Sequence, residues 1–306
     1  MTNQKIIISD PTLRDGSHAL RHKFNEKNIS TYCKLAEKAN VPIVEIGHGN
    51  GLGASSIQLG ESLLSETKML SVARKFLKKT RLGVHVIPGF ATIEKNIKPA
   101  IDLGVDVFRI ATHCTEADVS ERHISFLRDK NIDVWGCLMM SHMITPDSLI
   151  LEAKKMESYG ATGVVFMDSA GAFTPDDVSE RVGGLVSELN ILIGFHGHNN
   201  LNLAIGNSLV ALKKGATLID ACAYGFGAGA GNTQLEALVA ATEKLGFESG
   251  IDFNKSLDLA SYIAKNFEKP SSSVSIDSII SGYYGVFSGF LNPVRRIAKE
   301  FQVKEI

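Results

Sequence analysis

Short apolar runs recur along most of the chain, separated by longer stretches in which polar residues alternate with apolar ones. The runs are almost continuously hydrophobic and rich in Val, Ile and Leu, a pattern typical of parallel strands that are covered on both faces. We therefore interpret them as strands of a mostly parallel sheet. There are eight, at residues 6–13, 42–47, 82–88, 105–112, 132–140, 163–169, 191–198 and 218–225.

The stretches between the runs have the periodicity and the boundaries of helices. Two of them, 145–160 and 174–189, open with Thr-Pro, which suits a capping residue followed by a proline in the first turn. Eight strand–helix repeats of roughly 25 to 35 residues predict a (β/α)8 TIM barrel over residues 1–250. Further helices are predicted at residues 27–39, 115–129, 202–215 and 233–246.

A doubly wound α/β sheet is the alternative fold. It would usually have fewer strands, with a G-x-G-x-x-G sequence directly after the first, where this chain has DPTLRDG. The pattern changes after residue 246, beyond which no clear strand follows. Helices are predicted at 254–267 and 276–302, with a break near Pro293. We expect residues 251–306 to form a C-terminal helical extension.

Composition narrows the class of protein without naming a function. The chain has 306 residues, of which 44% are hydrophobic and 21% charged, and a net charge of −1. This balance argues against nucleic acid or a membrane surface as a partner. The four cysteines form no C-x-x-C pair, and neither a signal-peptide pattern nor an 18-residue apolar run is present. We expect buried thiols and a cytoplasmic location.

A pair of histidines marks the end of the seventh run. Residues i and i+2 of a strand point to the same side, so His196 and His198 in GFHGHNN would aim at one point. Asp15, at the end of the first run, would complete a set of two imidazoles and a carboxylate suited to a divalent ion. Each histidine could instead be a hydrogen-bonded core residue, and Asp15 a helix N-cap.

Other polar residues also collect at strand ends, where TIM barrels place their active sites. Arg14 is predicted to stabilise an anion, with a surface ion pair as the alternative, and His18 to act as a general base. Asn232, which ends the glycine-rich sequence GFGAGAGN, is predicted to reach either the metal itself or the residues that support its ligands. The side chains expected to bind substrate are Glu45, His85 and Ser169.

Several long motifs resemble one known family. The sequences SDPTLRDGSHALRH, VEIGHGNGLGASS, RIATHCTEADVS, LMMSHM, MESYGATGVVFMDSAGA, HGHNNLNLAIGNS and YGFGAGAGNTQLEAL are similar to those of the 4-hydroxy-2-oxovalerate aldolases. This family lies within the metal-dependent barrels that include hydroxymethylglutaryl-CoA lyase and isopropylmalate synthase. The resemblance runs from about residue 6 to about residue 300.

The resemblance implies a class II pyruvate aldolase of aromatic-hydrocarbon catabolism, which cleaves a 4-hydroxy-2-oxo acid into pyruvate and an aldehyde. It implies that Asp15, His196 and His198 hold a divalent metal, usually Mn2+, with Mg2+, Co2+ or Zn2+ as alternatives. It also implies that Arg14 stabilises the enolate and His18 takes the proton of the 4-hydroxyl. Tyr283, in the C-terminal extension, falls on the family's active-site tyrosine, although packing is the alternative for a tyrosine on a helix.

The absence of lysine from the eight predicted strands independently argues against a Schiff-base aldolase. Two features depart from the family pattern. His85 falls in a segment that is mostly aliphatic in the family and lines the aldehyde pocket. We therefore expect the enzyme to take a more polar aldehyde, or His85 to be a hydrogen-bonded core residue. The chain ends soon after Tyr283, where members that pair with an acylating aldehyde dehydrogenase have further helices, which argues against that partner. A homodimer is left open.

Two rival functions remain from the sequence. One is an acyl-CoA-dependent condensing enzyme or lyase that uses the same metal ligands, for which CoA dependence would be the distinguishing observation. The other is a catalytically inactive barrel that serves as a scaffold. The presence of Arg14, Asp15, His18, both histidines and Tyr283 together argues against the scaffold.

Overall fold

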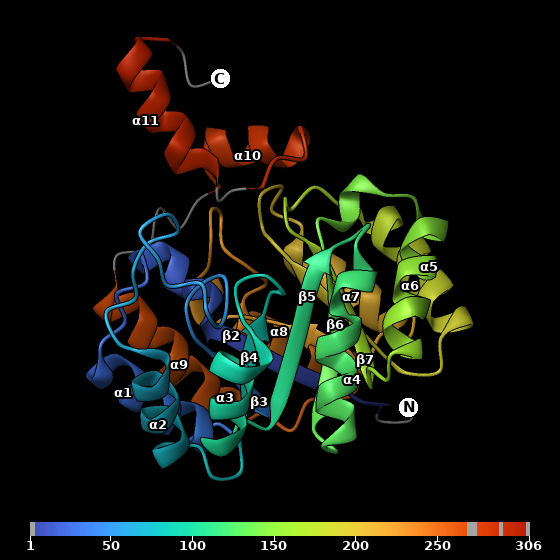
Figure 1. Cartoon of the computed structure of the whole chain (residues 1–306). Coiled ribbons are helices and arrows are strands. Elements are labelled where there is room, and N and C mark those ends of the chain that lie inside the picture. The colour runs from blue at the N-terminus through green and yellow to red at the C-terminus, as the bar shows by residue number, and fades with distance from the viewer. Residues whose placement is uncertain (1–3, 268–273, 288–289, 304–306) are drawn as a thin grey trace.

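Eight parallel strands close into a barrel in the computed structural model, which describes residues 4–267, 274–287 and 290–303 (Figure 1). Neighbours in sequence are neighbours in the barrel, and β2 closes it by pairing with β9, with Ile8 opposite Ile219. The predicted TIM barrel is therefore confirmed. The strands are β2 (Ile7–Leu13), β3 (Ile43–Ile46), β4 (Arg81–Val86), β5 (Val107–His113), β6 (Asp133–Met139), β7 (Gly163–Asp168), β8 (Leu192–Gly197) and β9 (Leu218–Asp220).

The strand sequences read as nearly continuous apolar runs because both faces of each strand are buried. One face packs against the surrounding helices, and the other fills the barrel with a smaller cluster that includes Ile43, Val107, Trp135, Val165 and Leu218. Side chains alternate along a strand, so the residue two positions further along also points inward. Two positions beyond Ile43, Val107 and Leu218 the inward residues are Glu45, Arg109 and Asp220, so a charged layer lies above this part of the apolar floor, toward the carboxyl ends of the strands.

The helices form a ring around the barrel (Figure 1). Thr145 and Thr174 cap their helices by accepting hydrogen bonds from the backbone N–H three residues on, as the Thr-Pro sequences predicted. The ring helices are α1 (Glu26–Lys38), α2 (Glu66–Phe76), α3 (Lys98–Asp102), α4 (Glu121–Asp129), α5 (Pro146–Ser158), α6 (Pro175–Glu188), α7 (Ala204–Lys213) and α8 (Leu235–Leu245). Helices α2 and α3 were not predicted from the sequence. The small parallel pair of β1 (Gln4–Lys5) with β10 (Phe247–Glu248) was not predicted either.

Three helices follow the last strand: α9 (Phe253–Asn266), α10 (Ile276–Tyr283) and α11 (Leu291–Phe301). Helix α9 packs into the ring through its buried residues Leu259 and Ile263. Helix α10 lies across the end of the barrel toward which β5 points, and α11 extends away from the barrel (Figure 1). The division of the chain at residue 250 stays a prediction.

The expected helix over 276–302 is interrupted earlier than predicted. Helix α10 ends at Tyr283, whereas Pro293 lies inside the first turn of α11. A proline is tolerated there because the backbone N–H groups of the first turn have no helical partner. The predicted break within 276–302 is therefore present, but it precedes Pro293 and does not arise from this proline.

The four cysteines are buried, and none forms a disulfide, as expected. Among the described residues, no helix has both the length and the hydropathy needed to cross a membrane.

Candidate metal centre and active site

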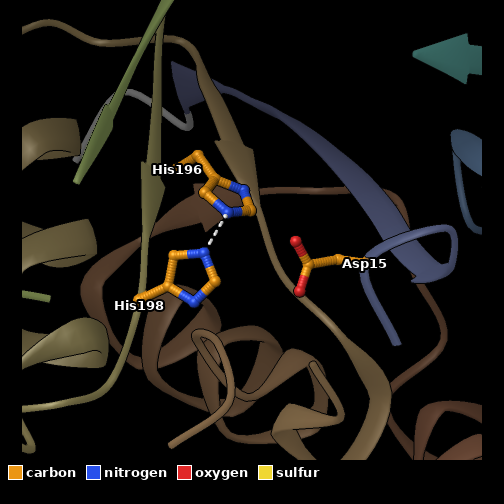
Figure 2. Close-up of side chains that lie close together, drawn as sticks. All are labelled: Asp15, His196 and His198. Carbon is orange, nitrogen blue, oxygen red and sulfur yellow. Dashed lines mark hydrogen bonds between the residues drawn. The ribbon is translucent and has the colours of Figure 1, made fainter. Parts of the chain in front are cut away.

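Three side chains converge at the carboxyl end of the barrel. His196 lies on β8 and His198 directly follows the last residue of that strand, and their Nε2 atoms lie 3.3 Å apart. The carboxylate of Asp15, directly after β2, faces them (Figure 2). One ligand atom from each of the three residues lies within 4.8 Å of the other two, and all three residues are buried. The structure thus brings together the set that the sequence proposed as metal ligands.

The protonation of this set suits a divalent cation. Nδ1 of His196 lies 2.9 Å from Oδ2 of Asp220, and because an ionised carboxylate only accepts, Nδ1 carries a proton and Nε2 is the ring nitrogen left to face a metal. Burial lowers the pKa of His198 to about 4, which keeps that ring neutral. Burial acts to raise the pKa of Asp15, but the nearby Arg14 and His198 outweigh it and hold the pKa well below its usual range. Two neutral imidazoles and a carboxylate are the forms that ligate a metal.

The glycine-rich loop after β9 supports Asp15. Oδ1 of Asp15 accepts hydrogen bonds from the backbone N–H of Ala228 at 2.9 Å and from Nδ2 of Asn232 at 3.0 Å. A Cβ on Gly227 would lie 2.7 Å from Oδ1 of Asp15 and 2.3 Å from Nδ2 of Asn232. The loop therefore approaches the carboxylate closely only because residue 227 is glycine. Asn232 contacts a candidate ligand, and its role beside a bound metal stays a prediction.

Arg14 is buried between two carboxylates and is not a surface residue. Its Nη1 donates to Oδ2 of Asp15, and its Nε donates to Oε2 of Glu45, both at 2.9 Å. Burial acts to lower the pKa of Arg14, but the charges of Glu45 and Asp15 raise it overall, so the guanidinium stays positive beside the candidate metal site. The surface ion pair considered as the alternative is excluded.

His18 lies in a 3-10 turn after Asp15 and packs against Gly49. A Cβ on Gly49 would lie 2.5 Å from Nε2 of His18. Burial lowers the pKa of His18 and Arg14 lowers it further, against the opposing effect of Asp15. The imidazole is therefore neutral near pH 7 and able to accept a proton.

Two charged residues in this layer were not identified as site residues from the sequence. Arg109 on β5 donates from Nη1 and Nη2 to the two oxygens of Asp220 on β9, at 3.0 and 2.6 Å. Its Nη1 also lies 3.0 Å from Oε1 of Glu45. Burial acts to raise the pKa of Asp220, but Arg109 and His196 lower it overall, so Asp220 is ionised. In the sequence, the one feature that could have identified these two residues is a charged side chain within an otherwise apolar strand.

The three residues predicted to bind substrate lie at this end of the barrel. Both carboxylate oxygens of Glu45 are paired with arginines, which makes it a support for Arg14. Oγ of Ser169 accepts a hydrogen bond from the backbone N–H of Met140 at 3.0 Å. His85 is buried, and burial together with Arg14 holds its pKa well below the usual range, so it is neutral. Their contact with substrate stays a prediction.

Tyr283 is not brought into the buried cluster, since it lies near the end of α10 with 76% of its surface exposed. Phe287, a few residues further, instead packs against His198, with ring centroids 6.4 Å apart. Helix α10 is held over the site by Ser281, whose Oγ accepts a hydrogen bond from Nδ2 of Asn200 at 2.8 Å. Phe287 had no distinguishing signal in the sequence.

Two family models match this chain. Residues 5–263 match the HMGL-like model, and residues 272–306 match the DmpG-like communication domain. Among solved structures, the HMG-CoA lyase of Brucella melitensis has a TM-score of 0.74 at 16% identity, covering 86% of this chain and 98% of that one. The carboxyl transferase domain of Rhizobium etli pyruvate carboxylase, solved with pyruvate, has a TM-score of 0.82 at 15% identity, covering 99% and 55%. At these identities the likeness shows the fold.

Curated relatives are much closer in sequence. The 4-hydroxy-2-oxovalerate aldolase of Pectobacterium atrosepticum is 55% identical over 300 residues, covering 98% of this chain and 88% of that protein. The enzyme of the same name from Spirochaeta aurantia is also 55% identical, covering 96% and 86%. With the HMGL-like match over the barrel, these identities show that the chain belongs to the family of 4-hydroxy-2-oxovalerate aldolases.

Proposed function

We propose that this protein cleaves a 4-hydroxy-2-oxo acid, such as 4-hydroxy-2-oxovalerate, into pyruvate and an aldehyde, and that it does so with a divalent metal, Mn2+ foremost. The observation that carries the proposal is the grouping of Asp15, His196 and His198 with a buried arginine, Arg14, which pairs with Asp15. A metal bound to the three ligands would polarise the 2-oxo group of the substrate and serve as the electron sink.

The protein's own side chains provide the remaining requirements of a retro-aldol cleavage. The neutral His18 accepts the proton of the 4-hydroxyl as the bond between C3 and C4 breaks and C4 becomes an aldehyde. Arg14 stabilises the negative charge that moves from C3 to the 2-oxo oxygen, because its guanidinium is already fixed and charged before the reaction. No lysine lies on the eight barrel strands or among the buried residues that the structure describes, which supports the metal route over a Schiff base.

The test is pyruvate release from racemic 4-hydroxy-2-oxopentanoate, coupled to lactate dehydrogenase, with Mn2+ and then with EDTA. We expect release that depends on the metal and is lost in His196→Ala. His123→Ala is the matched control, because His123 lies on the outer helix α4 and its Nε2 contacts the backbone oxygen of Ala91. No pyruvate from metal-loaded protein would overturn the proposal. Condensation of acetyl-CoA with a 2-oxo acid would then be measured for the rival function.

The role proposed for Tyr283 rests on the family resemblance, and the adjacent Tyr284 provides a matched control. Both rings are exposed in the structure, 76% and 71%. If Tyr283 orients or protonates the substrate, Tyr283→Phe lowers kcat and Tyr284→Phe does not. Equal behaviour of the two variants would remove Tyr283 from the active site.

The end of the chain supports a protein partner that consumes the aldehyde. Residues 272–306 match a DmpG-like communication domain. This match favours a pairing with an acylating aldehyde dehydrogenase, which the sequence had argued against. We propose this enzyme as the partner of α10 and α11. Their exposed apolar residues include Ile276, Ile279, Val294, Ile297 and Phe301. Sedimentation of the two proteins, alone and mixed, tests the proposal, and absence of a joint species at micromolar concentration would contradict it.

A further inference from the structure

A chain of buried ion pairs runs beneath the candidate metal site. At its centre is Arg109, whose side chain has no exposed surface. Its guanidinium forms two bonds to Asp220 and a third contact to Glu45. The three residues come from β5, β9 and β3 and stand two positions after the floor residues Val107, Leu218 and Ile43. They therefore form one charged layer across the inside of the barrel.

Each carboxylate of this layer continues to a residue of the site. Oδ2 of Asp220 accepts the Nδ1–H of His196 at 2.9 Å, and Oε2 of Glu45 accepts the Nε–H of Arg14 at 2.9 Å. Arg109 is thus linked through Asp220 to the candidate metal ligand His196, and through Glu45 to Arg14. A displacement of the Arg109 guanidinium would therefore displace both of these side chains.

Stability alone does not explain such a layer. Taking several charges out of water costs free energy that their mutual attraction seldom exceeds, and apolar replacements of similar volume are often neutral or stabilising. The apolar floor directly below shows that the barrel interior accepts such residues. A carboxylate that holds Nδ1–H of an imidazole, in contrast, fixes the tautomer and the ring orientation of a metal ligand.

We propose that Asp220 and Arg109 are positioning residues: Asp220 holds His196 with Nε2 toward the metal, and Arg109 fixes Asp220 while anchoring Arg14 through Glu45. The inference rests on the proposed metal centre but goes beyond it, because Asp220 acts through His196 and Arg109 acts through Asp220 and Glu45. It predicts that changes in the layer alter metal binding itself, apart from the rate of the loaded enzyme.

The primary test is the affinity for Mn2+, measured by the electron paramagnetic resonance signal of the free ion during titration. Asp220→Asn keeps the shape of the side chain but is a weaker acceptor, and its amide can turn an N–H toward His196. We expect Mn2+ binding to weaken about 10- to 100-fold. Asp10→Asn is the matched control, because Asp10 is a buried carboxylate of β2 that hydrogen-bonds Tyr32 and Thr12. Its Mn2+ affinity should equal that of the wild type.

A second variant tests the link through Arg109. Arg109→Lys keeps the positive charge, but a single ammonium cannot present the planar fork that bonds both oxygens of Asp220. We expect weaker Mn2+ binding and, at saturating Mn2+, a lower kcat because Glu45 no longer holds Arg14 in place to stabilise the developing negative charge. A purely structural role would lower the melting temperature and leave the Mn2+ affinity unchanged.

A measurement on the wild-type protein keeps the inference falsifiable if a variant fails to fold. Nitrogen-15 spectra of histidine-labelled protein, with His196 assigned by comparison with His196→Gln, report which ring nitrogen carries the proton. We expect the proton on Nδ1 in the metal-free protein. A proton on Nε2, or wild-type Mn2+ affinity in a folded Asp220→Asn, would overturn the inference. Failure of pyruvate release alone would overturn the proposed reaction and leave this inference standing.

Discussion

The backbone of Gly49 lies directly against the imidazole of His18, so a Cβ at residue 49 would approach Nε2 to 2.5 Å. The carbonyl oxygen of the same residue also lies 3.3 Å from Nη1 of Arg14. Gly49 therefore contacts both His18, the proposed base, and Arg14, the proposed anion-stabilising group. Its close approach to His18 is possible because residue 49 has no side chain.

Gly49→Ala should displace His18 without touching the metal ligands. Because misplacing a catalytic group by about 1 Å can cost up to about 100-fold in rate, we expect kcat to fall by about 10- to 100-fold. The Mn2+ affinity should stay at the wild-type value. Gly183→Ala on α6, where a Cβ meets no atom within 4 Å, is the control and should keep full activity. An unchanged kcat in Gly49→Ala would show that the rate does not depend on the position of His18, which would contradict its role as the base.

His18 itself should control the acid limb of the pH profile. Its pKa lies below the ordinary value of 6.5 because of burial and Arg14, so the base loses activity only when the pH falls below that value. In His18→Ala we expect a fall in kcat of about 10²- to 10⁴-fold and loss of this limb. The profile of kcat/KM is measured at saturating Mn2+ in both proteins. An acid limb that survives in the variant with the same midpoint would assign it to another group.

Gly227→Ala tests the loop that supports the proposed ligand Asp15. The added methyl group would press on Oδ1 of Asp15 and on Nδ2 of Asn232. Since displacing the support of a ligand usually weakens metal binding, we expect Mn2+ affinity to drop by about 10- to 100-fold. Gly206→Ala on α7, where a Cβ meets open space, provides the comparison. Equal Mn2+ affinity in the two variants would contradict the assignment of Asp15 as a ligand.

The strands and the three candidate ligands were predictable from the sequence for a physical reason. Parallel strands covered on both faces must be apolar throughout, and the i, i+2 spacing of His196 and His198 fixes their common direction. The partners of the buried charges were not predictable. Arg109 and Asp220 are 111 positions apart, and only closure of the barrel brings their side chains together. The packing of Phe287 on His198 likewise depends on how α10 crosses the barrel end.

Asp10 lies outside the proposed mechanism, but its ionisation should make the stability of the fold depend on pH. Burial raises its pKa to about 6 in the folded protein, against an ordinary 3.8, although hydrogen bonds from Thr12 and Tyr32 oppose the rise. The folded state therefore holds this proton more tightly than the unfolded state does. The free energy of unfolding should decrease as the pH rises from about 4 to about 7, by roughly 2 to 3 kcal/mol for this one group. Above about pH 7 its contribution should no longer change.

Asp10→Asn should remove this dependence. The amide can accept the hydrogen bond from the backbone N–H of Thr12, while the Tyr32 hydroxyl can donate to Oγ1 of Thr12, 3.0 Å away. Relative to the wild type, the variant should therefore gain stability between pH 4 and pH 7, measured by urea unfolding at each pH. Asp258→Asn, which removes an exposed carboxylate on α9, is the control for the change of side chain. A wild-type–variant difference in unfolding free energy that stays constant over this range would mean that Asp10 is already ionised at pH 4 in the folded barrel.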